Sequence, residues 1–158
     1  MIQRIQSLYL LASAALVAIA TCFNFAIFSF EGYEIFVSPY AISASAPEIV
    51  ASIELQPMLS LGVSMWLVVA FTLSAIFLYK KRKLQMNFVR YIGVFKIALI
   101  AFVAFFTYRL VANDATGLMY MQLDASSLLL IISIITDVLA FFAIRKDERL
   151  VRSIDRIR

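Results

Sequence analysis

Four long apolar stretches alternate with shorter polar ones along the chain. They cover residues 8–30, 58–79, 91–108 and 126–144. Each contains roughly 20 residues, enough for an α-helix to cross a bilayer core of about 30 Å at 1.5 Å of rise per residue. The pattern therefore predicts an all-α polytopic membrane protein, a single domain in which four transmembrane helices form a bundle.

The first apolar stretch resembles a secretory signal peptide at its start. Arg4 precedes it, and the small residues Ala18 and Ala20 resemble a cleavage site. The apolar residues continue well past that site, through Phe25 and Phe28. We therefore interpret this stretch as an uncleaved first span.

Residues 31–57 form the longest stretch that is not apolar, with four Glu, three Pro and no Lys or Arg. Apolar and polar residues alternate on both sides of Glu31 and Gly32, which predicts a small β-hairpin. A second extended piece is predicted at residues 49–55. Two roles remain open for this segment: a lid or docking surface over the bundle, or simple cover for the helix ends.

The basic residues are concentrated on one side of the predicted bundle. Arg4, the run at residues 80–83 with Arg90, and the tail from Arg145 onward fall on that side, whereas the two opposite connectors carry only Arg109. The positive-inside rule then places both termini in the cytoplasm and the connectors 31–57 and 111–125 outside.

Composition supports a membrane protein and argues against several functions. The chain is 63% hydrophobic and 15% charged, whereas about 25% of residues are charged in an average soluble domain. The net charge of +4 does not predict a nucleic-acid partner, because the cations lie beside apolar spans. With one cysteine, Cys22, and no histidine, we expect no metal, no cofactor and no enzymatic activity.

Two ionisable residues lie inside predicted spans. Lys96 is six residues from Arg90 and Asp137 is eight residues from Arg145, which places them about 9 and 12 Å from the same face. Isolated charges at this depth are costly, so we expect Asp137 to approach Lys96. The pair could fix the register of two helices or serve as a protonatable step in transport. In a third interpretation Lys96 extends to the interface, and Asp137 is protonated or bonded to Ser133 or Thr136.

The tail, residues 145–158, predicts an amphipathic helix that carries charges of both signs. Glu148 and Arg152 form an i,i+4 pair on it. The helix could meet a partner or the chain's own basic loop, or merely continue the fourth span. The candidate contacts for lipid or a partner are Lys80, Lys81, Arg82, Lys83, Arg149, Arg152 and Arg156.

Three motifs, MIQRIQSLYLL at residues 1–11, YKKRKLQ at 79–85 and IRKDERLVRSIDRIR at 144–158, carry a resemblance to a known family. The chain resembles a small four-span inner-membrane family of Gram-negative bacteria defined as a domain of unknown function. The resemblance covers the whole chain and implies a multi-pass protein of the bacterial inner membrane, without implying a catalytic residue, cofactor or substrate.

These patterns favour a non-enzymatic accessory or scaffold subunit. Besides the lipid bilayer, its expected partner is a protein bound at the cytoplasmic face through the basic loop and the tail helix, and a homo-oligomer is compatible with the sequence. The alternative is a small transporter or ion-linked channel that uses Asp137 and Lys96.

Overall fold

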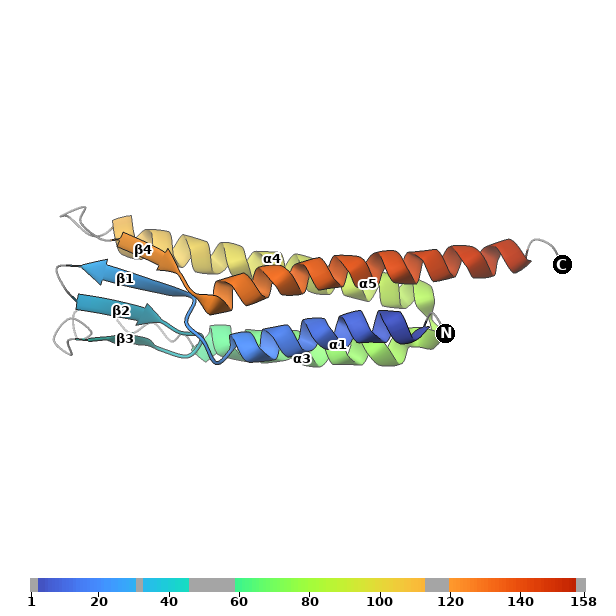
Figure 1. The fold of residues 1–158 in the computed structure, drawn as a ribbon, viewed down its shortest axis with the longest axis horizontal. Coiled ribbons are helices and arrows are strands. Elements are labelled where there is room, and N and C mark those ends of the chain that lie inside the picture. The colour runs from blue at the N-terminus through green and yellow to red at the C-terminus, as the bar shows by residue number, and fades with distance from the viewer. Residues whose placement is uncertain (1–2, 31–32, 46–58, 113–119, 156–158) are drawn as a thin grey trace.

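The computed structural model describes residues 3–30, 33–45, 59–112 and 120–155. In these residues four long helices lie side by side along one axis, with a small sheet at one end (Figure 1). They are α1 (Gln3–Ala20), α3 (Leu59–Phe77), α4 (Arg82–Ala112) and α5 (Ala125–Asp155). The start of α1 and the end of α5 both lie opposite the sheet (Figure 1). We call that end the basic end and the other the sheet end.

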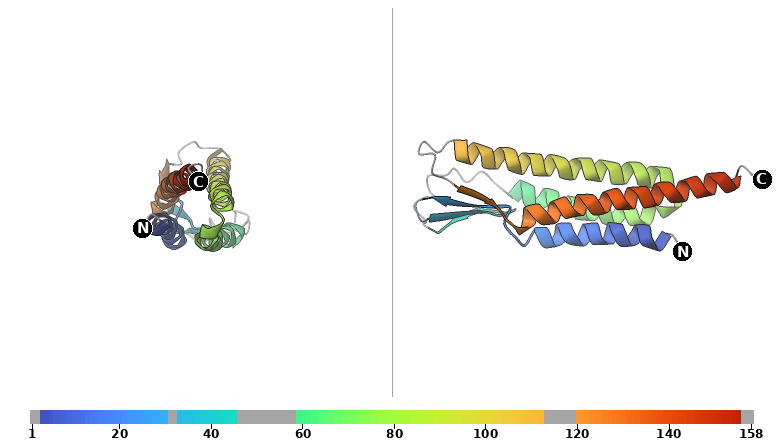
Figure 2. Two further views of the ribbon diagram at one scale, coloured as in Figure 1. Left: turned by 90° about the vertical axis from the view of Figure 1, so that its right-hand side faces the viewer. Right: turned by 45° about the horizontal axis from the view of Figure 1, so that its top comes forward.

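The helices form a four-cornered bundle, seen end-on in Figure 2. α1 packs against α5 and α3, and α4 packs against the same two helices. Buried side chains recur on each helix three or four positions apart, the spacing of one helix face. The bundle core includes Leu10, Ala14, Val17, Met65, Val68, Leu99, Val103, Leu130, Ala140 and Ile144.

Within the described residues, three helical segments are long and apolar enough to cross a membrane: Leu59–Phe77, Arg82–Phe106 and Ala125–Val151. The apolar part of α1, Ile5–Ala20, is shorter. Many large apolar side chains, such as Phe102 on α4, point outward, which is the surface that a lipid environment requires. The chain is therefore mostly helical with a small antiparallel sheet, and its long apolar helices suggest a membrane protein.

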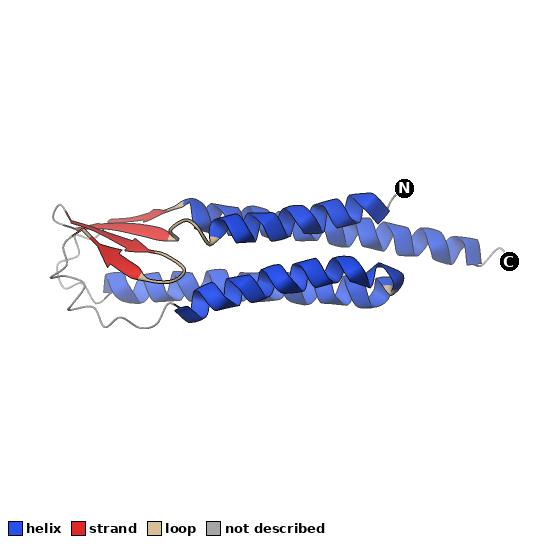
Figure 3. Cartoon of the chain, turned by 90° about the horizontal axis from the view of Figure 1, so that it is seen from below, coloured by secondary structure: helices blue, strands red, loops and turns tan. Residues whose placement is uncertain are grey.

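The sheet contains β1 (Ala26–Phe30), β2 (Tyr33–Val37), β3 (Ile42–Ala44) and β4 (Tyr120–Leu123) in the order β3-β2-β1-β4. All neighbouring strands are antiparallel. Figure 3 shows the sheet at one end of the bundle, and Figure 1 shows that it extends beyond α1, α3 and α5, whereas α4 continues further than these helices in the same direction. Side chains alternate between the two faces of a strand, and one face of this sheet is buried. That face includes Ala26, Phe28, Ile35, Val37 and Ile42.

The predicted first span, residues 8–30, is wrong beyond Ala20. α1 ends there, and Ala26–Phe30 forms β1 in the centre of the sheet. Phe25 begins the new pairing, since its backbone N–H donates to the Val37 carbonyl at 2.7 Å. Apolar character continues through this change because the strand is also largely buried, and a short apolar run does not distinguish a strand from a helix.

The predicted hairpin is present: β1 pairs with β2 in a register that places Phe30 opposite Tyr33. Its two turn residues lie outside the described residues, as does the extended piece predicted at 49–55. The prediction that residues 111–125 form only a loop is wrong, because β4 pairs with β1 and places Ala26 opposite Leu123. Both connectors at the sheet end thus contribute to one sheet.

The other predicted helices are present, but their boundaries differ from the predicted ones. The second span is confirmed as α3, followed by a short 3-10 helix, η1 (Leu78–Lys80). The connector predicted at 84–90 is wrong, because these residues belong to α4. The tail is helical as predicted through Asp155, but it continues α5 without a break and protrudes past the other helices (Figure 2).

A glycine allows the sheet to dock on α3. A Cβ atom built at Gly62 would lie 2.4 Å from the ring of Tyr40, which is in the bend between β2 and β3. The Tyr40 hydroxyl in turn accepts a hydrogen bond of 2.8 Å from the indole N–H of Trp66, one turn further along α3. The close approach therefore depends on the absence of a side chain at Gly62.

We expect Gly62→Val to destabilise the fold by about 1–3 kcal/mol, the usual cost of overpacking. The same change at Gly93 is the matched control, because nothing lies within 4 Å of a Cβ there. Thermal unfolding in detergent checks the stability. Trp66, the only tryptophan, reports the contact directly, and its emission should shift in Gly62→Val alone. Equal unfolding temperatures and spectra for the two variants would contradict this account.

Candidate functional site

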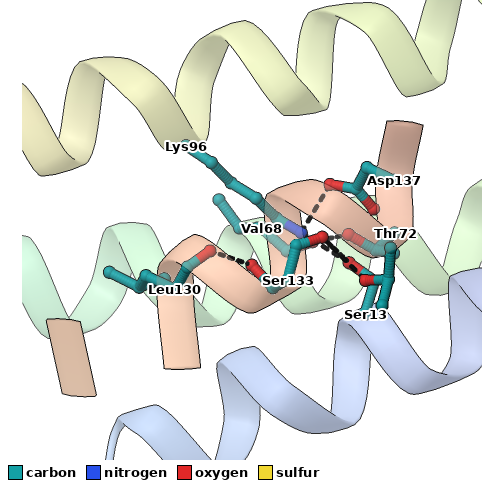
Figure 4. Close-up of polar contacts among 8 residues, drawn as sticks. Ser13, Val68, Thr72, Lys96, Leu130, Ser133 and Asp137 are labelled. Carbon is teal, nitrogen blue, oxygen red and sulfur yellow. Dashed lines mark hydrogen bonds and ion pairs between the residues drawn. The ribbon is translucent and has the colours of Figure 1, made fainter. Parts of the chain in front are cut away.

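An ion pair lies inside the bundle where α4 faces α5. Lys96 Nζ is 2.6 Å from Asp137 Oδ2, and the two side chains are 0% and 3% exposed. The same ammonium group donates a second hydrogen bond of 2.6 Å to Ser13 Oγ on α1 (Figure 4). The contact expected from the similar depths of Lys96 and Asp137 is thus present, and it includes a third helix.

Each charged residue occupies a position of its helix that faces the core. Lys96 follows Ile92 by four residues and precedes Leu99 by three, and both of these are buried. Asp137 follows Ser133 by four residues and precedes Ala140 by three, again both buried. The helical period alone therefore directs both side chains into the bundle.

Hydroxyl groups surround the pair. Ser13 Oγ accepts from Lys96 and donates to the Ser133 carbonyl at 3.3 Å, so it connects α1 to both α4 and α5. Thr72 on α3 is fully buried and lies near the pair in Figure 4, where its hydroxyl donates to the Val68 carbonyl at 2.7 Å. Polar side chains from all four helices meet at this level. Among the described residues, Asp137 Oδ1 has no hydrogen-bond partner.

The chemistry of this cluster favours a role in holding the helices together over a role in catalysis. A serine beside a lysine can act as nucleophile and base, but the Lys96 ammonium is engaged by Asp137 and both residues are completely buried. An ion pair in a low-dielectric interior instead penalises any arrangement of the helices that separates it. No group of three or more His, Cys, Asp or Glu that could hold a metal occurs within the part of the chain described.

A second buried polar cluster lies toward the basic end. Gln6 on α1 donates a hydrogen bond to the Asp147 carboxylate of α5, and Arg82 donates to the Asp147 carbonyl at 3.4 Å. The sequence analysis missed Gln6 and Asp147. A signal was available, because Ala140, Ile144 and Asp147 continue the buried stripe of α5 at spacings of four and three residues. The tail therefore remains part of the bundle as far as Asp147.

The structure brings the predicted basic loop next to the tail. Beside the turn between α3 and α4 lies a hollow of about 530 Å³, which we call the basic hollow. It is lined by Tyr79, Lys81, Arg82, Lys83, Leu84, Glu148 and Val151.

The remaining predicted contacts are not all at this hollow. Arg149 lies on a different part of α5, where it lines a shallow hollow of about 350 Å³ with Phe142, Arg145, Lys146 and Leu150. Lys80 belongs to η1 and Arg152 to α5, and their side chains are not described. Arg156 lies outside the described residues.

Comparison with known families identifies the chain without assigning an activity. The model of a domain of unknown function, DUF4293, matches residues 2–157. No curated protein and no solved structure matches the sequence. Any function must therefore be argued from the geometry described above.

Removing one charge of the ion pair should destabilise the fold more than removing both charges. We expect Lys96→Met and Asp137→Asn each to lower the free energy of unfolding by about 3–5 kcal/mol, because each leaves a buried group without its charged partner. The double variant Lys96→Met/Asp137→Leu should recover most of this loss. Equilibrium unfolding in mixed detergent micelles measures all three.

Lys83→Gln provides the control, since this exposed residue should change stability by less than about 0.5 kcal/mol. Wild-type stability and function for Asp137→Asn would show that the charge is incidental. With Asp137→Leu as the matching single variant, a loss in the double variant equal to the sum of the losses for Lys96→Met and Asp137→Leu would also contradict a direct interaction.

Proposed function

The chain belongs to the DUF4293 family, a domain of unknown function, and we propose that it is a non-enzymatic membrane accessory subunit. In this proposal a protein partner binds at the basic hollow and the protruding end of α5. The single observation that carries the proposal is the placement of the cationic α3–α4 turn beside Val151 of α5 in one hollow. The two segments lie about 70 residues apart in the chain, yet they form a common surface.

The chemistry of the hollow defines the expected partner. Lys81, Arg82 and Lys83 contribute positive charge, while Leu84 and Val151 contribute apolar surface. A complementary segment therefore carries Asp or Glu beside at least one large apolar side chain. Glu148 on the same wall would disfavour a uniformly acidic partner and favour one with a mixed charge pattern.

We further propose that α1 crosses the membrane as a fourth span, with both termini in the cytoplasm of a bacterial cell and the sheet outside its inner membrane. α1 has 18 residues, about 27 Å at 1.5 Å per residue. It lies alongside the other helices over the same part of the bundle (Figure 1). The cationic turn at the basic end supports this orientation through the positive-inside rule.

The alternative function, ion-linked transport through Lys96 and Asp137, receives less support. A transport path needs access to its ionisable groups from both sides of the membrane, whereas these side chains are 0% and 3% exposed. Lys96 donates hydrogen bonds to Ser13 and to Asp137, and these two bonds tie three helices together. This favours a fixed structural role for the pair.

Site-specific photo-crosslinking in intact membranes tests the proposed partner. A photoreactive amino acid at Lys83 and, in a separate variant, at Val151 should give adducts with the same protein, because both residues line the basic hollow. The same reagent at Phe105, which is 61% exposed on α4, is the control and should give no such adduct.

Charge reversal at Lys81, as Lys81→Glu, should reduce the Val151 adduct at least about fivefold if cationic contacts contribute about 1 kcal/mol each. A chain ending after Glu148 keeps the contact between Gln6 and Asp147 and should lose the partner without unfolding. Different partners at the two positions, or an adduct that is insensitive to Lys81→Glu, would contradict the proposal.

A further inference from the structure

A lateral groove between α4 and α5 borders the buried ion pair, since Asp137 is one of its lining residues, and shares no lining residue with the basic hollow. Its volume is about 250 Å³, and its walls are mainly apolar. Gly93, Val94 and Ile97 line it from α4, and Val138 and Phe142 line it from α5. Val94, Ile97, Val138 and Phe142 are all exposed on the outer surface of the bundle. We call this feature the α4–α5 groove, and in a membrane it faces the lipid.

The groove exists partly because α4 has a glycine at its centre. A Cβ at Gly93 would meet nothing within 4 Å, so this position leaves open space rather than a tight helix contact. The residues at 90, 93, 94 and 97 recur three or four positions apart along α4, which gives the groove a direction parallel to the helix axis. An extended acyl chain that lies parallel to the helix axis would follow this direction.

Positive charge lies at the end of the groove nearer the basic end. Arg90 lines the groove, and its guanidinium lies 5.5 Å from the centre of the Phe141 ring. Phe142 is shared between the groove and the shallow hollow that contains Arg145, Lys146 and Arg149. An apolar channel at membrane depth thus continues directly into a group of exposed cations.

The negative charges nearby do not cancel this group. Asp147 is buried and accepts from Gln6, while Glu148 lines the basic hollow. Asp137 also lines the groove, but its charge is balanced by Lys96 at 2.6 Å. The residues that line the groove and the shallow hollow thus include four cations, Arg90, Arg145, Lys146 and Arg149, against the one carboxylate of Asp137, which Lys96 balances.

We propose that the α4–α5 groove binds one anionic phospholipid, with an acyl chain along Gly93, Val94 and Ile97 and the phosphate at Arg90 and Arg145. Charge complementarity selects a lipid over an apolar helix of another protein, because a helix would cover the groove without satisfying these cations. The inference concerns a different surface from the proposed protein partner. It relies on the membrane location alone.

Native mass spectrometry of the purified full-length chain tests this site. The probes are phosphatidylglycerol and phosphatidylcholine with identical palmitoyl and oleoyl chains. We expect one phosphatidylglycerol to bind more tightly than phosphatidylcholine. Arg90→Gln should weaken phosphatidylglycerol binding about fivefold, the contribution expected of one interfacial cation, and weaken phosphatidylcholine binding less, because the choline cation offsets the charge of its phosphate. Arg109→Gln, which removes an exposed cation in the last turn of α4 that does not line the groove, should change neither.

Filling the groove separates a bound acyl chain from general attraction to cations. Gly93→Leu should weaken both lipids, whereas Ala98→Leu adds similar bulk at an exposed α4 position that does not line the groove and should weaken neither. If Gly93→Leu loses helical circular dichroism, Val94→Trp performs the same test at an exposed groove position.

Equal affinity for the two lipids would overturn the anionic headgroup assignment. Unchanged binding in a folded groove-filled variant would overturn the assignment of the groove. A photoreactive group at Val94 should give a phospholipid adduct in membranes, and a protein adduct there would also overturn the proposal. None of these outcomes affects the crosslinking result at Lys83 and Val151, so the two proposals fail separately.

Discussion

The interaction between Lys96 and Asp137 constrains the whole bundle. Two opposite charges lie 2.6 Å apart with almost no exposure, in a region where either charge alone would be strongly unfavourable. Because Ser13 accepts from the same ammonium and donates to the Ser133 carbonyl, a shift of α1, α4 or α5 along its axis would break a polar contact. Apolar packing between these helices cannot impose that precision, since lipid is nearly as apolar as the core.

At the sheet end of the bundle, the sheet provides hydrogen-bond partners for the backbone. Backbone groups that leave the helices must still find partners, and the antiparallel strands supply them. The chain returns to this sheet after α4: Asp124 N–H donates to the Phe25 carbonyl at 3.0 Å, and Ser127 Oγ donates to the same carbonyl at 2.8 Å. These contacts connect the end of α1 to the start of α5. The two helices are thus held together by the sheet at one end and by Gln6 and Asp147 toward the other.

Three groups of charged residues, one central and two at the basic end, have different consequences. The central ion pair is buried and fixes geometry, which fits a stable framework. The cations at the basic end are exposed in two separate places, one beside the α3–α4 turn and one continuing from the α4–α5 groove. This separation allows a protein partner and a lipid to bind the same end without competing. A membrane accessory subunit of the kind proposed would act by holding such components next to each other.

The sequence by itself determined the apolar character of the chain, the approximate positions of the long helices and the similar depth of Lys96 and Asp137, because hydrophobicity and helical rise are local properties. The hairpin followed from the alternation around its turn. The end of α1 at Ala20, the pairing of β4 with β1 and the role of Ser13 were decided only by tertiary structure. The first depends on the pairing of Phe25 with Val37, 12 residues away, and the other two join residues about 80 to 100 positions apart in the chain. The sequence pattern indicates which residues avoid water, but it does not indicate which distant groups they contact.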